Sequence, residues 1–177
     1  MVMVKEIKLE DIKELFKRRK IDANKGDFGK VGILGGSVKY SGAVKLAYMS
    51  LCTLRSGAGL VRVIVPKEII EFIAPYLLEQ TMHPYDTLED IKVAIKEIDS
   101  LAIGMGWDYD EKHLAILEYV LENFNGNLIL DADGLNTLVG HLELLKESNA
   151  KIVLTPHLKE FSRLTGLSID DILNDEV

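Results

Sequence analysis

The sequence is poor in cysteine, in long apolar runs and in positive charge, and each shortage narrows the range of functions. Cys52 is the only cysteine among 177 residues, which excludes an intramolecular disulfide framework and a cysteine-based zinc cluster. No apolar run approaches the roughly 18 residues that span a bilayer, because Lys45 interrupts the longest candidate. The first residues are charged and do not resemble a signal peptide. We therefore expect a cytoplasmic protein with no membrane contact.

The balance of charge argues against a nucleic-acid partner. Lys and Arg number 21 against 28 Asp and Glu, which gives a net charge of −7. Proteins that bind nucleic acids usually carry a basic surface, and we expect none here. The basic run at 17–20 follows acidic residues and is interpreted as a solvated helix face. Hydrophobic residues make up 47% and charged residues 28%, so the composition indicates one globular domain over residues 1–177.

Short apolar segments alternate with amphipathic ones along most of the chain. The apolar segments predict strands near 31–35, 60–65, 101–104, 128–131 and 152–155. The segments between them predict helices at 8–20, 41–56, 67–78, 88–98, 110–123 and 134–147, and again from 159 and from 169. The helix at 41–56 is apolar nearly all round and is expected to be the most buried element. Strand and helix in this rhythm predict an α/β fold, a doubly wound, mostly parallel sheet with helices on both faces.

The residues that follow four of these strands are candidates for a binding site. In an open parallel sheet, ligands bind beyond the carboxyl ends of the strands. The four loops read Gly-Gly-Ser at 35–37, Gly-Met-Gly at 104–106, Asp-Ala-Asp at 131–133 and Thr-Pro-His at 155–157. Glycines allow a ligand to approach the backbone, whereas acids, histidine and helix N-termini supply polar contacts.

The two glycine loops allow a structural and a functional interpretation. The first leads to a helix that begins near Ser41, which we expect to be its N-cap, and Gly42 leaves that helix start open to a ligand. Either this loop binds a ligand or it is the tight turn that any such fold needs. It matches neither the P-loop nor the G-x-G-x-x-G pattern. In the second loop, Trp107 either stacks on a ring or serves as a partly buried anchor, and the anchor is the commoner case.

The acidic loop and the histidine loop carry the remaining polar candidates. Asp133 fits a helix N-cap, whereas Asp131 directly follows a buried strand. A role for Asp131 as a Mg²⁺ ligand has little support, because the sequence shows no further carboxylate cluster to complete the site. His157 is expected to face the cleft, with Glu160 three residues later either orienting it or capping the helix. The sequence contains no Ser-His-Asp arrangement and no metal-ligand cluster, and His83, His113 and His141 are interpreted as surface or core positions without partners.

Taken in order, these motifs resemble a known family. The segments KGDFGK at 25–30, GILGGSVKYSGAVKLA at 32–47, LRSGAGLVRV at 54–63, IGMG at 103–106, LILDADGLN at 128–136 and LTPHLKEFSRLTG at 154–166 are similar to those of the ATP- or ADP-dependent NAD(P)H-hydrate dehydratases. That family is a branch of the ribokinase-like superfamily. The resemblance covers roughly residues 21 to 177. Met105 and Trp107-Asp108 depart from the family pattern, as does Leu158-Lys159.

The resemblance implies a repair reaction. Enzymes of this family remove water from the S-epimer of hydrated NADH or NADPH with ATP or ADP, and Mg²⁺ is expected as a cofactor. The ring hydroxyl is phosphorylated and the phosphate then leaves, so catalysis is mainly positioning and electrostatics. By the family pattern, Ala43, Gly106 and His157 contact the hydrated dinucleotide. The same resemblance adds a further set with weaker support: Gly36, Ser37, Tyr40, Ser41, Gly104, Asp131, Asp133 and Glu160.

The resemblance also implies segments that this sequence does not contain. The family continues to a lysine-glycine strand end and a Gly-Ser/Thr-Gly-Asp motif, which supply the nucleotide-phosphate site and the aspartate general base. No such motif occurs before Val177, so we expect the base beyond residue 177, assign no catalytic residue and expect a ribokinase-like domain incomplete at its C-terminus. The chain is then a fragment, the product of an interrupted gene or one half of a split enzyme. We expect a homo-oligomer, with a tetramer among the options, or a second chain that completes the domain.

Two other functions stay open at this point. One is a related kinase that phosphorylates a hydroxyl on a small heterocycle; the DADGLN and LTPHLKEF pair favours the dehydratase over it, although such kinases carry similar segments. The other is a non-catalytic remnant that binds a dinucleotide without turnover.

Overall fold

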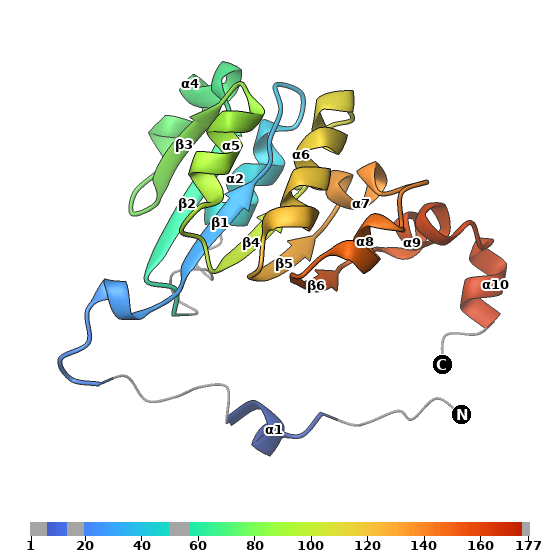
Figure 1. Ribbon diagram of the computed structural model, residues 1–177, viewed down its shortest axis with the longest axis horizontal. Coiled ribbons are helices and arrows are strands. Elements are labelled where there is room, and N and C mark those ends of the chain that lie inside the picture. The colour runs from blue at the N-terminus through green and yellow to red at the C-terminus, as the bar shows by residue number, and fades with distance from the viewer. Residues whose placement is uncertain (1–6, 14–19, 50–56, 175–177) are drawn as a thin grey trace.

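A computed structural model describes residues 7–13, 20–49 and 57–174. Its centre is an all-parallel sheet of six strands in the order β3-β2-β1-β4-β5-β6 (Figure 1). The strands are β1 Lys30–Leu34, β2 Leu60–Pro66, β3 Thr81–Tyr85, β4 Ser100–Ile103, β5 Asn127–Leu130 and β6 Lys151–Leu154. All five predicted strands are confirmed, and so is the doubly wound architecture.

β3 is the strand that the sequence pattern did not predict. Its segment Thr-Met-His-Pro-Tyr is mostly polar, and Pro84 lies within it. Proline cannot donate to a sheet ladder, so it argues against a central strand. β3 pairs only with β2, with Pro84 opposite Val65, and an edge strand tolerates the missing donor. Tyr85, which is buried, ends the strand.

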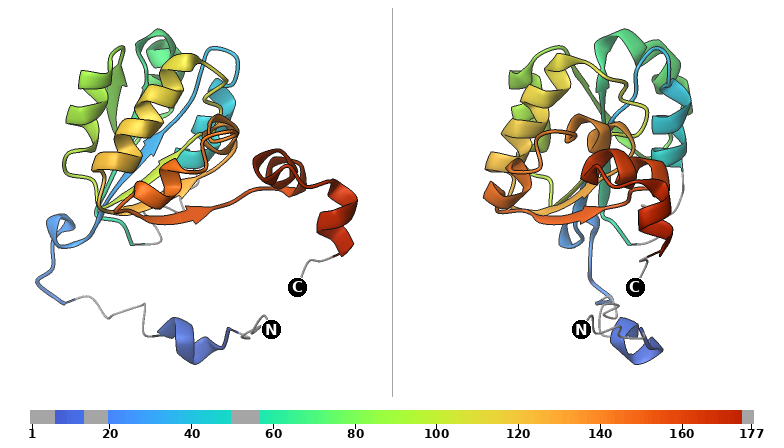
Figure 2. Two further views of the ribbon diagram at one scale, coloured as in Figure 1. Left: turned by 45° about the vertical axis from the view of Figure 1, so that its right-hand side comes forward. Right: turned by 90° about the vertical axis from the view of Figure 1, so that its right-hand side faces the viewer.

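Helices cover the sheet unequally on its two faces. The right-hand view of Figure 2 shows α5 (Leu88–Ile95) and α6 (Glu111–Asn123) on one side, and α2 (Ser41–Met49) and α4 (Ile70–Ile73) on the other. The remaining described helices are α1 Leu9–Lys13, α7 Asp133–Thr137, α8 Leu144–Glu147, α9 Leu158–Thr165 and α10 Ile169–Asn174. Three short 3-10 helices are η1 Lys25–Asp27, η2 Lys67–Ile69 and η3 Ala74–Tyr76.

Several predicted helices are shorter than expected or broken. The predicted helix at 67–78 is the run η2-α4-η3, and the one at 134–147 is divided into α7 and α8, with Gly140 at positive φ between them. Of the predicted helix 8–20, the described part is α1, which lies apart from the sheet and buries no residue (Figure 1). Residues 14–19 lie outside the described residues.

The expectation that helix 41–56 is the most buried element is wrong for its described part. Within α2, the fully buried side chains are Val44 and Tyr48, whereas Leu46 is 74% exposed. The reason is that only one stripe of α2 packs on β1 and β2, and no described element covers its outer side. α6 instead buries five residues. Residues 50–56 of the predicted helix lie outside the described part of the chain.

The strand order creates the place where a ligand fits. From β1 the chain proceeds to β2 and β3 on one side, and from β4 it proceeds to β5 and β6 on the other. The loops that follow β1 and β4 therefore leave the sheet in opposite directions, which opens a crevice between them. We call this point, beyond the carboxyl ends of β1 and β4, the switch point.

Candidate functional site

The two loops at the switch point are joined at their base by backbone hydrogen bonds. The amide of Gly36 donates to the carbonyl of Met105 at 3.0 Å, and the amide of Gly104 donates to the carbonyl of Leu34 at 3.0 Å. A further bond, 3.2 Å long, links the side-chain oxygen of Ser37 to the amide of Tyr40 and shapes the first loop. The two bonds between the loops fix them relative to each other. Because Gly36 and Gly104 have no side chains, the two backbones can approach closely at this point.

Gly106 brings three of the predicted site residues together. Its φ is +67°, a conformation that L side chains rarely adopt. A Cβ at this position would lie 2.5 Å from the carbonyl oxygen of Tyr40 and 2.8 Å from the Cβ of Ala43. Gly106, Tyr40 and Ala43 are therefore in direct contact, and the fit leaves no room for a side chain.

Gly36 and Ser37 line a pocket of about 310 Å³ at this point, together with Lys39, Trp107, Asp108 and His113. We call it the switch-point pocket. Lys39 lies 4.0 Å from a carboxylate oxygen of Asp108. A hydrogen bond with Tyr40, and next the charge of Asp108, raises the pKa of Lys39. The lining of the pocket thus carries one protonated amine, Lys39, against three carboxylates, Glu68, Asp108 and Asp110.

The two aspartates that follow β5 hold neighbouring loops. Asp131 accepts a hydrogen bond from the hydroxyl of Thr155 at 3.0 Å, and Asp133 accepts one from the amide of Asp108 at 2.9 Å. Asp133 also accepts from the side-chain amide of Asn136. It is the first residue of α7 and not the N-cap that the sequence predicted. Ser41 is likewise the first residue of α2. The carboxylates of Asp131 and Asp133 therefore connect the loops that follow β4, β5 and β6.

His157 lies at the same edge of the sheet but farther along it. It follows β6, three strands from β1, or roughly 14 Å at the usual strand spacing. It is the N-cap of α9, and its Nδ1 accepts from the amides of Lys159 and Glu160. Its Nε2 lies 3.2 Å from buried Glu160, whose other oxygen accepts from the His157 amide. Glu160 therefore both orients His157 and completes the cap. The imidazole is 61% exposed, and both of its nitrogens contact residues in the first turn of α9.

A network of aromatic residues that the sequence pattern did not predict lies beside the switch point. Trp107 is fully buried, not partly, and its Nε1 donates to the hydroxyl of Tyr85 at 2.8 Å. The Trp107 ring stacks on His113 with centroids 4.1 Å apart and planes inclined by 15°. Nδ1 of His113 lies 3.0 Å from the carbonyl oxygen of Asp108. The interpretation of His113 as a residue without partners is therefore wrong.

The network carries two perturbed groups. Burial raises the pKa of the Tyr85 hydroxyl far above its usual range. Burial also lowers the pKa of His113, against the opposing effect of the Asp108 carbonyl and of nearby carboxylates. His113 is thus neutral near pH 7, and because the Asp108 carbonyl can only accept, Nδ1 carries the proton. No sequence signal joined these residues, since Tyr85 ends the strand that was not predicted.

Two further structural findings bear on what the site can hold. Among the described residues, no group of three or more His, Cys, Asp or Glu side chains is placed to hold a metal ion. Within the same residues, no helix is long and apolar enough to cross a membrane.

Comparison with known proteins places these observations in a family. A family model described as NAD(P)H-hydrate dehydratase matches residues 31–177. The chain is 34% identical over 164 residues to the bifunctional NAD(P)H-hydrate repair enzyme Nnr of Thermofilum pendens, covering 87% of this chain and 31% of that enzyme. It is 35% identical over 162 residues to the ATP-dependent (S)-NAD(P)H-hydrate dehydratase of Entamoeba histolytica, covering 86% of this chain and 52% of that enzyme.

A solved structure agrees with these relatives. The ADP/ATP-dependent NAD(P)H-hydrate dehydratase of Bacillus subtilis, co-crystallised with ATP and Mg²⁺, superposes with a TM-score of 0.77 at 28% identity. The match covers 94% of this chain and 58% of that one. The chain thus spans about a third to about half of the curated relatives it matches. With the ordered motifs and the ribokinase-like sheet in place, the chain belongs to the NAD(P)H-hydrate dehydratase family.

Proposed function

We propose that this protein takes part in the ATP- or ADP-dependent dehydration of the S-epimer of hydrated NADH or NADPH, and that its switch point binds the hydrated dinucleotide. The observation that carries the proposal is the contact of Gly106 with Ala43 and Tyr40. The residues brought together there belong to two of the motifs that resemble the family. The family match over residues 31–177 supports the same reaction.

In this proposal the residues of the chain bind and orient the substrate. Gly36, Gly104 and Gly106 are buried and let the loops after β1 and β4 pack closely, and Lys39 is the one cation in the lining of the switch-point pocket. Asp131 and Asp133 hold the loops in place. Transfer of a phosphoryl group to the ring hydroxyl then makes that oxygen a good leaving group, and positioning supplies much of the rate.

His157 and Glu160 complete the proposed site on the β6 side. A dinucleotide is long enough to reach from the switch point to the start of α9, roughly 14 Å away. For the imidazole to bind the substrate, Nε2 exchanges its contact with Glu160 for one with the ligand. Ser37, Tyr40, Ser41 and Ala43 shape the opposite wall.

The described residues do not by themselves fit a resident Mg²⁺ ion. They contain no cluster of three or more His, Cys, Asp or Glu ligands, and Asp131 and Asp133 already accept hydrogen bonds from neighbouring loops. We therefore assign no step to a metal and no residue of this chain as the general base. ATP or ADP remains the phosphoryl donor in the proposal. A cytoplasmic location, a single domain over 1–177 and self-association stay part of the proposal.

Turnover and binding of separated S- and R-hydrates test the proposal, with ATP and with ADP. The informative variant is Gly106→Ala, because a methyl group there meets Tyr40 and Ala43 at a strained φ. Gly140→Ala is the matched control, since Gly140 also has a positive φ, +86°, and a methyl group at that position would have no atom within 4 Å. We expect Gly106→Ala to weaken S-hydrate binding roughly tenfold, as expected for a local strain of about 1–3 kcal/mol, and Gly140→Ala to leave it unchanged.

Three outcomes separate the alternatives. Dehydration of the S-hydrate that falls with Gly106→Ala supports the dehydratase. Tight S-hydrate binding without turnover favours the dinucleotide-binding remnant. Equal affinity of both glycine variants for the S-hydrate would place the substrate elsewhere and refute the proposed site.

A further inference from the structure

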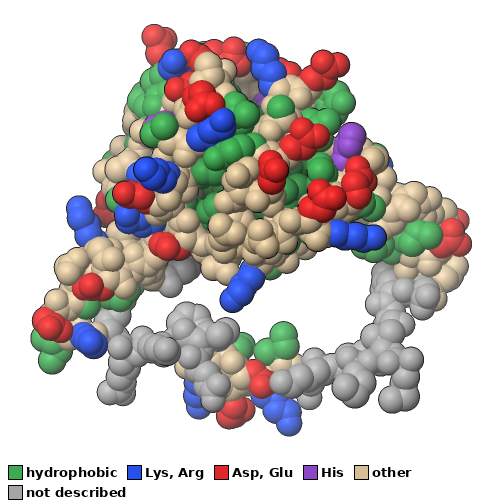
Figure 3. All heavy atoms as spheres, viewed as in Figure 1, with side chains coloured by type: hydrophobic (Ala, Val, Ile, Leu, Met, Phe, Trp, Pro, Cys, Tyr) green, Lys and Arg blue, Asp and Glu red, His purple; other side chains and the backbone are tan. Residues whose placement is uncertain are grey.

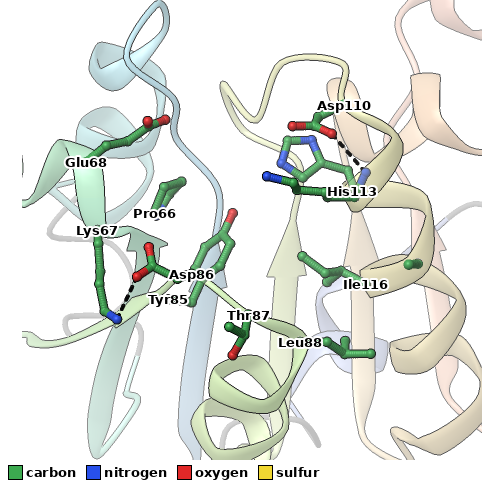
Figure 4. A pocket seen from close by; sticks show the side chains of 12 residues that line it. Pro66, Lys67, Glu68, Tyr85, Asp86, Thr87, Leu88, Asp110, His113 and Ile116 are labelled. Atoms are coloured by element: carbon green, nitrogen blue, oxygen red, sulfur yellow. Dashed lines mark hydrogen bonds and ion pairs between the residues drawn. The ribbon is translucent and has the colours of Figure 1, made fainter.

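A second pocket lies beside the switch point. It has a volume of about 310 Å³ and is lined by the ends of β2 and β3 and by the first turns of α5 and α6. Figure 4 shows Tyr85 and His113 on opposite sides of it, with the Tyr85 hydroxyl pointing toward the side where the His113 ring lies. We call it the Tyr85–His113 pocket. The proposed reaction as described gives this pocket no role.

Two buried polar groups in this pocket have unused hydrogen-bonding capacity. The Tyr85 oxygen accepts from Trp107, which leaves its own proton free to donate, and Tyr85 is only 6% exposed. His113 is 9% exposed, and its Nδ1 is committed to the Asp108 carbonyl. Nε2 of the neutral ring is therefore an acceptor, and it has no partner among the described residues. A donor and an acceptor thus face one small cavity.

The charges around the pocket disfavour an anion. Its lining includes three carboxylates, Glu68, Asp86 and Asp110, against two amines, Lys67 and Lys112. Lys67 is already paired with Asp86 at 2.7 Å, and that contact raises its pKa. Figure 3 shows side chains of both signs along the upper rim of the molecule, the end at which β1 finishes in Figure 1. A neutral ring avoids this excess of negative charge, which the switch-point pocket shares, because Glu68, Asp108 and Asp110 outnumber Lys39 in its lining.

The pocket adjoins the switch-point pocket. The two share Pro66, Glu68, Asp110 and His113 in their linings. A ligand bound at the switch point can therefore place an uncharged ring in the Tyr85–His113 pocket. Its size suits one planar ring and part of a sugar.

We propose that the Tyr85–His113 pocket binds a neutral planar ring that carries an amino or carboxamide group, one end of the dinucleotide held at the switch point. The Tyr85 hydroxyl donates to a ring nitrogen or an amide oxygen, and the N–H of the ligand donates to Nε2 of His113. Adenine and nicotinamide share this chemistry, and the experiment distinguishes them. The inference rests on the proposed function for the identity of the dinucleotide.

The protein contains its own reporter for this pocket, because Trp107 is its only tryptophan and bonds directly to Tyr85. Titration of the full chain with adenosine, and separately with nicotinamide, is followed by tryptophan fluorescence. We expect one of the two to change the emission saturably, and the ring that does so is the occupant. Tyr85→Phe and His113→Phe should each weaken its binding about tenfold, as expected for a lost buried hydrogen bond.

Matched variants separate loss of binding from loss of structure. Tyr76→Phe and His141→Phe change the same side chains at positions that line neither pocket and should bind the ring normally. Ala115→Phe fills the Tyr85–His113 pocket from an exposed position of α6 and should also abolish binding, with an unchanged thermal midpoint.

The inference is overturned if neither ring changes the emission, or if Tyr85→Phe, His113→Phe and Ala115→Phe all bind it within twofold of the unmodified protein. That result leaves the proposed function intact as long as Gly106→Ala still weakens S-hydrate binding. Conversely, saturable ring binding that Ala115→Phe removes supports the pocket even if the hydrate proves not to be the substrate.

Discussion

The two halves of the sheet differ in how they are covered. Around β1 and β2 both faces are buried, and Val63, on the face toward α2 and α4, is fully inaccessible. On the same face of β5 and β6, Ile129 is 37% exposed and Val153 is 55% exposed, and no described helix packs over them. The switch-point loops, the two pockets and the aromatic network lie on the covered half, whereas His157 lies beyond the open half. The comparison shows that burial on this face is greatest beside the strand, β1, from which the first glycine loop leaves the sheet.

Lysine substitutions on one face of the sheet should show the largest difference between the covered half and the open half. Val63→Lys places an ammonium group in a fully buried site, and we expect it to cost several kcal/mol, roughly 3 or more, or to prevent folding. Val153→Lys on the open half should change the free energy of unfolding by no more than about 0.5 kcal/mol. Urea unfolding of both variants measures the difference. A large loss for Val153→Lys would mean that something covers β6 in solution.

Variants of His157 test whether the residue beyond the open half binds the substrate or only caps α9. His157→Ala removes the N-cap of α9 and should cost about 0.5–2 kcal/mol of stability. His157→Asn keeps a capping oxygen and should cost less, while still lacking the imidazole. If the ring contacts the substrate, both variants weaken S-hydrate binding to a similar extent. If His157 serves only as a cap, the asparagine variant binds like the unmodified protein, and that result would remove His157 from the proposed site.

The pH dependence of stability tests the aromatic network on the covered half and should give the smallest effect. Burial lowers the pKa of His113, so below the ordinary histidine value, about 6.5, the unfolded chain binds the proton more readily than the folded one. Stability therefore falls as the pH drops below this value, toward the lowered pKa of the folded state. The unmodified protein should lose more stability between pH 7.5 and 5 than His113→Phe does, by thermal unfolding in matched buffers. Equal losses would show that His113 is not held neutral.

The sequence predicted the sheet well because its strands are short apolar segments between amphipathic helices. It missed β3, where proline and polar residues suit an edge strand that has no apolar pattern of its own. It also overestimated the burial of the described part of this predicted helix, residues 41–49, because composition shows that a helix is apolar and not whether another element covers it. Leu46 illustrates the difference.

For the site, the sequence predicted which loops meet but not what supports them. Strand ends in a parallel sheet share one edge, so Gly36, Gly106 and Asp131 could be grouped in advance. The Tyr85, Trp107 and His113 network joins three elements through side-chain geometry that no local spacing encodes. His157 was expected to face the cleft, and its capping bonds within α9 could not be read from the motif alone.

Hydrogen–deuterium exchange with added S-hydrate tests the central claim most directly, namely that the switch-point loops bind the hydrated dinucleotide. The proposal predicts slower amide exchange in residues 35–43 and 104–110, with the R-hydrate giving less protection at the same concentration. Saturating S-hydrate that leaves both loops unchanged, or that protects only segments away from the carboxyl edge of β1 and β4, would contradict it.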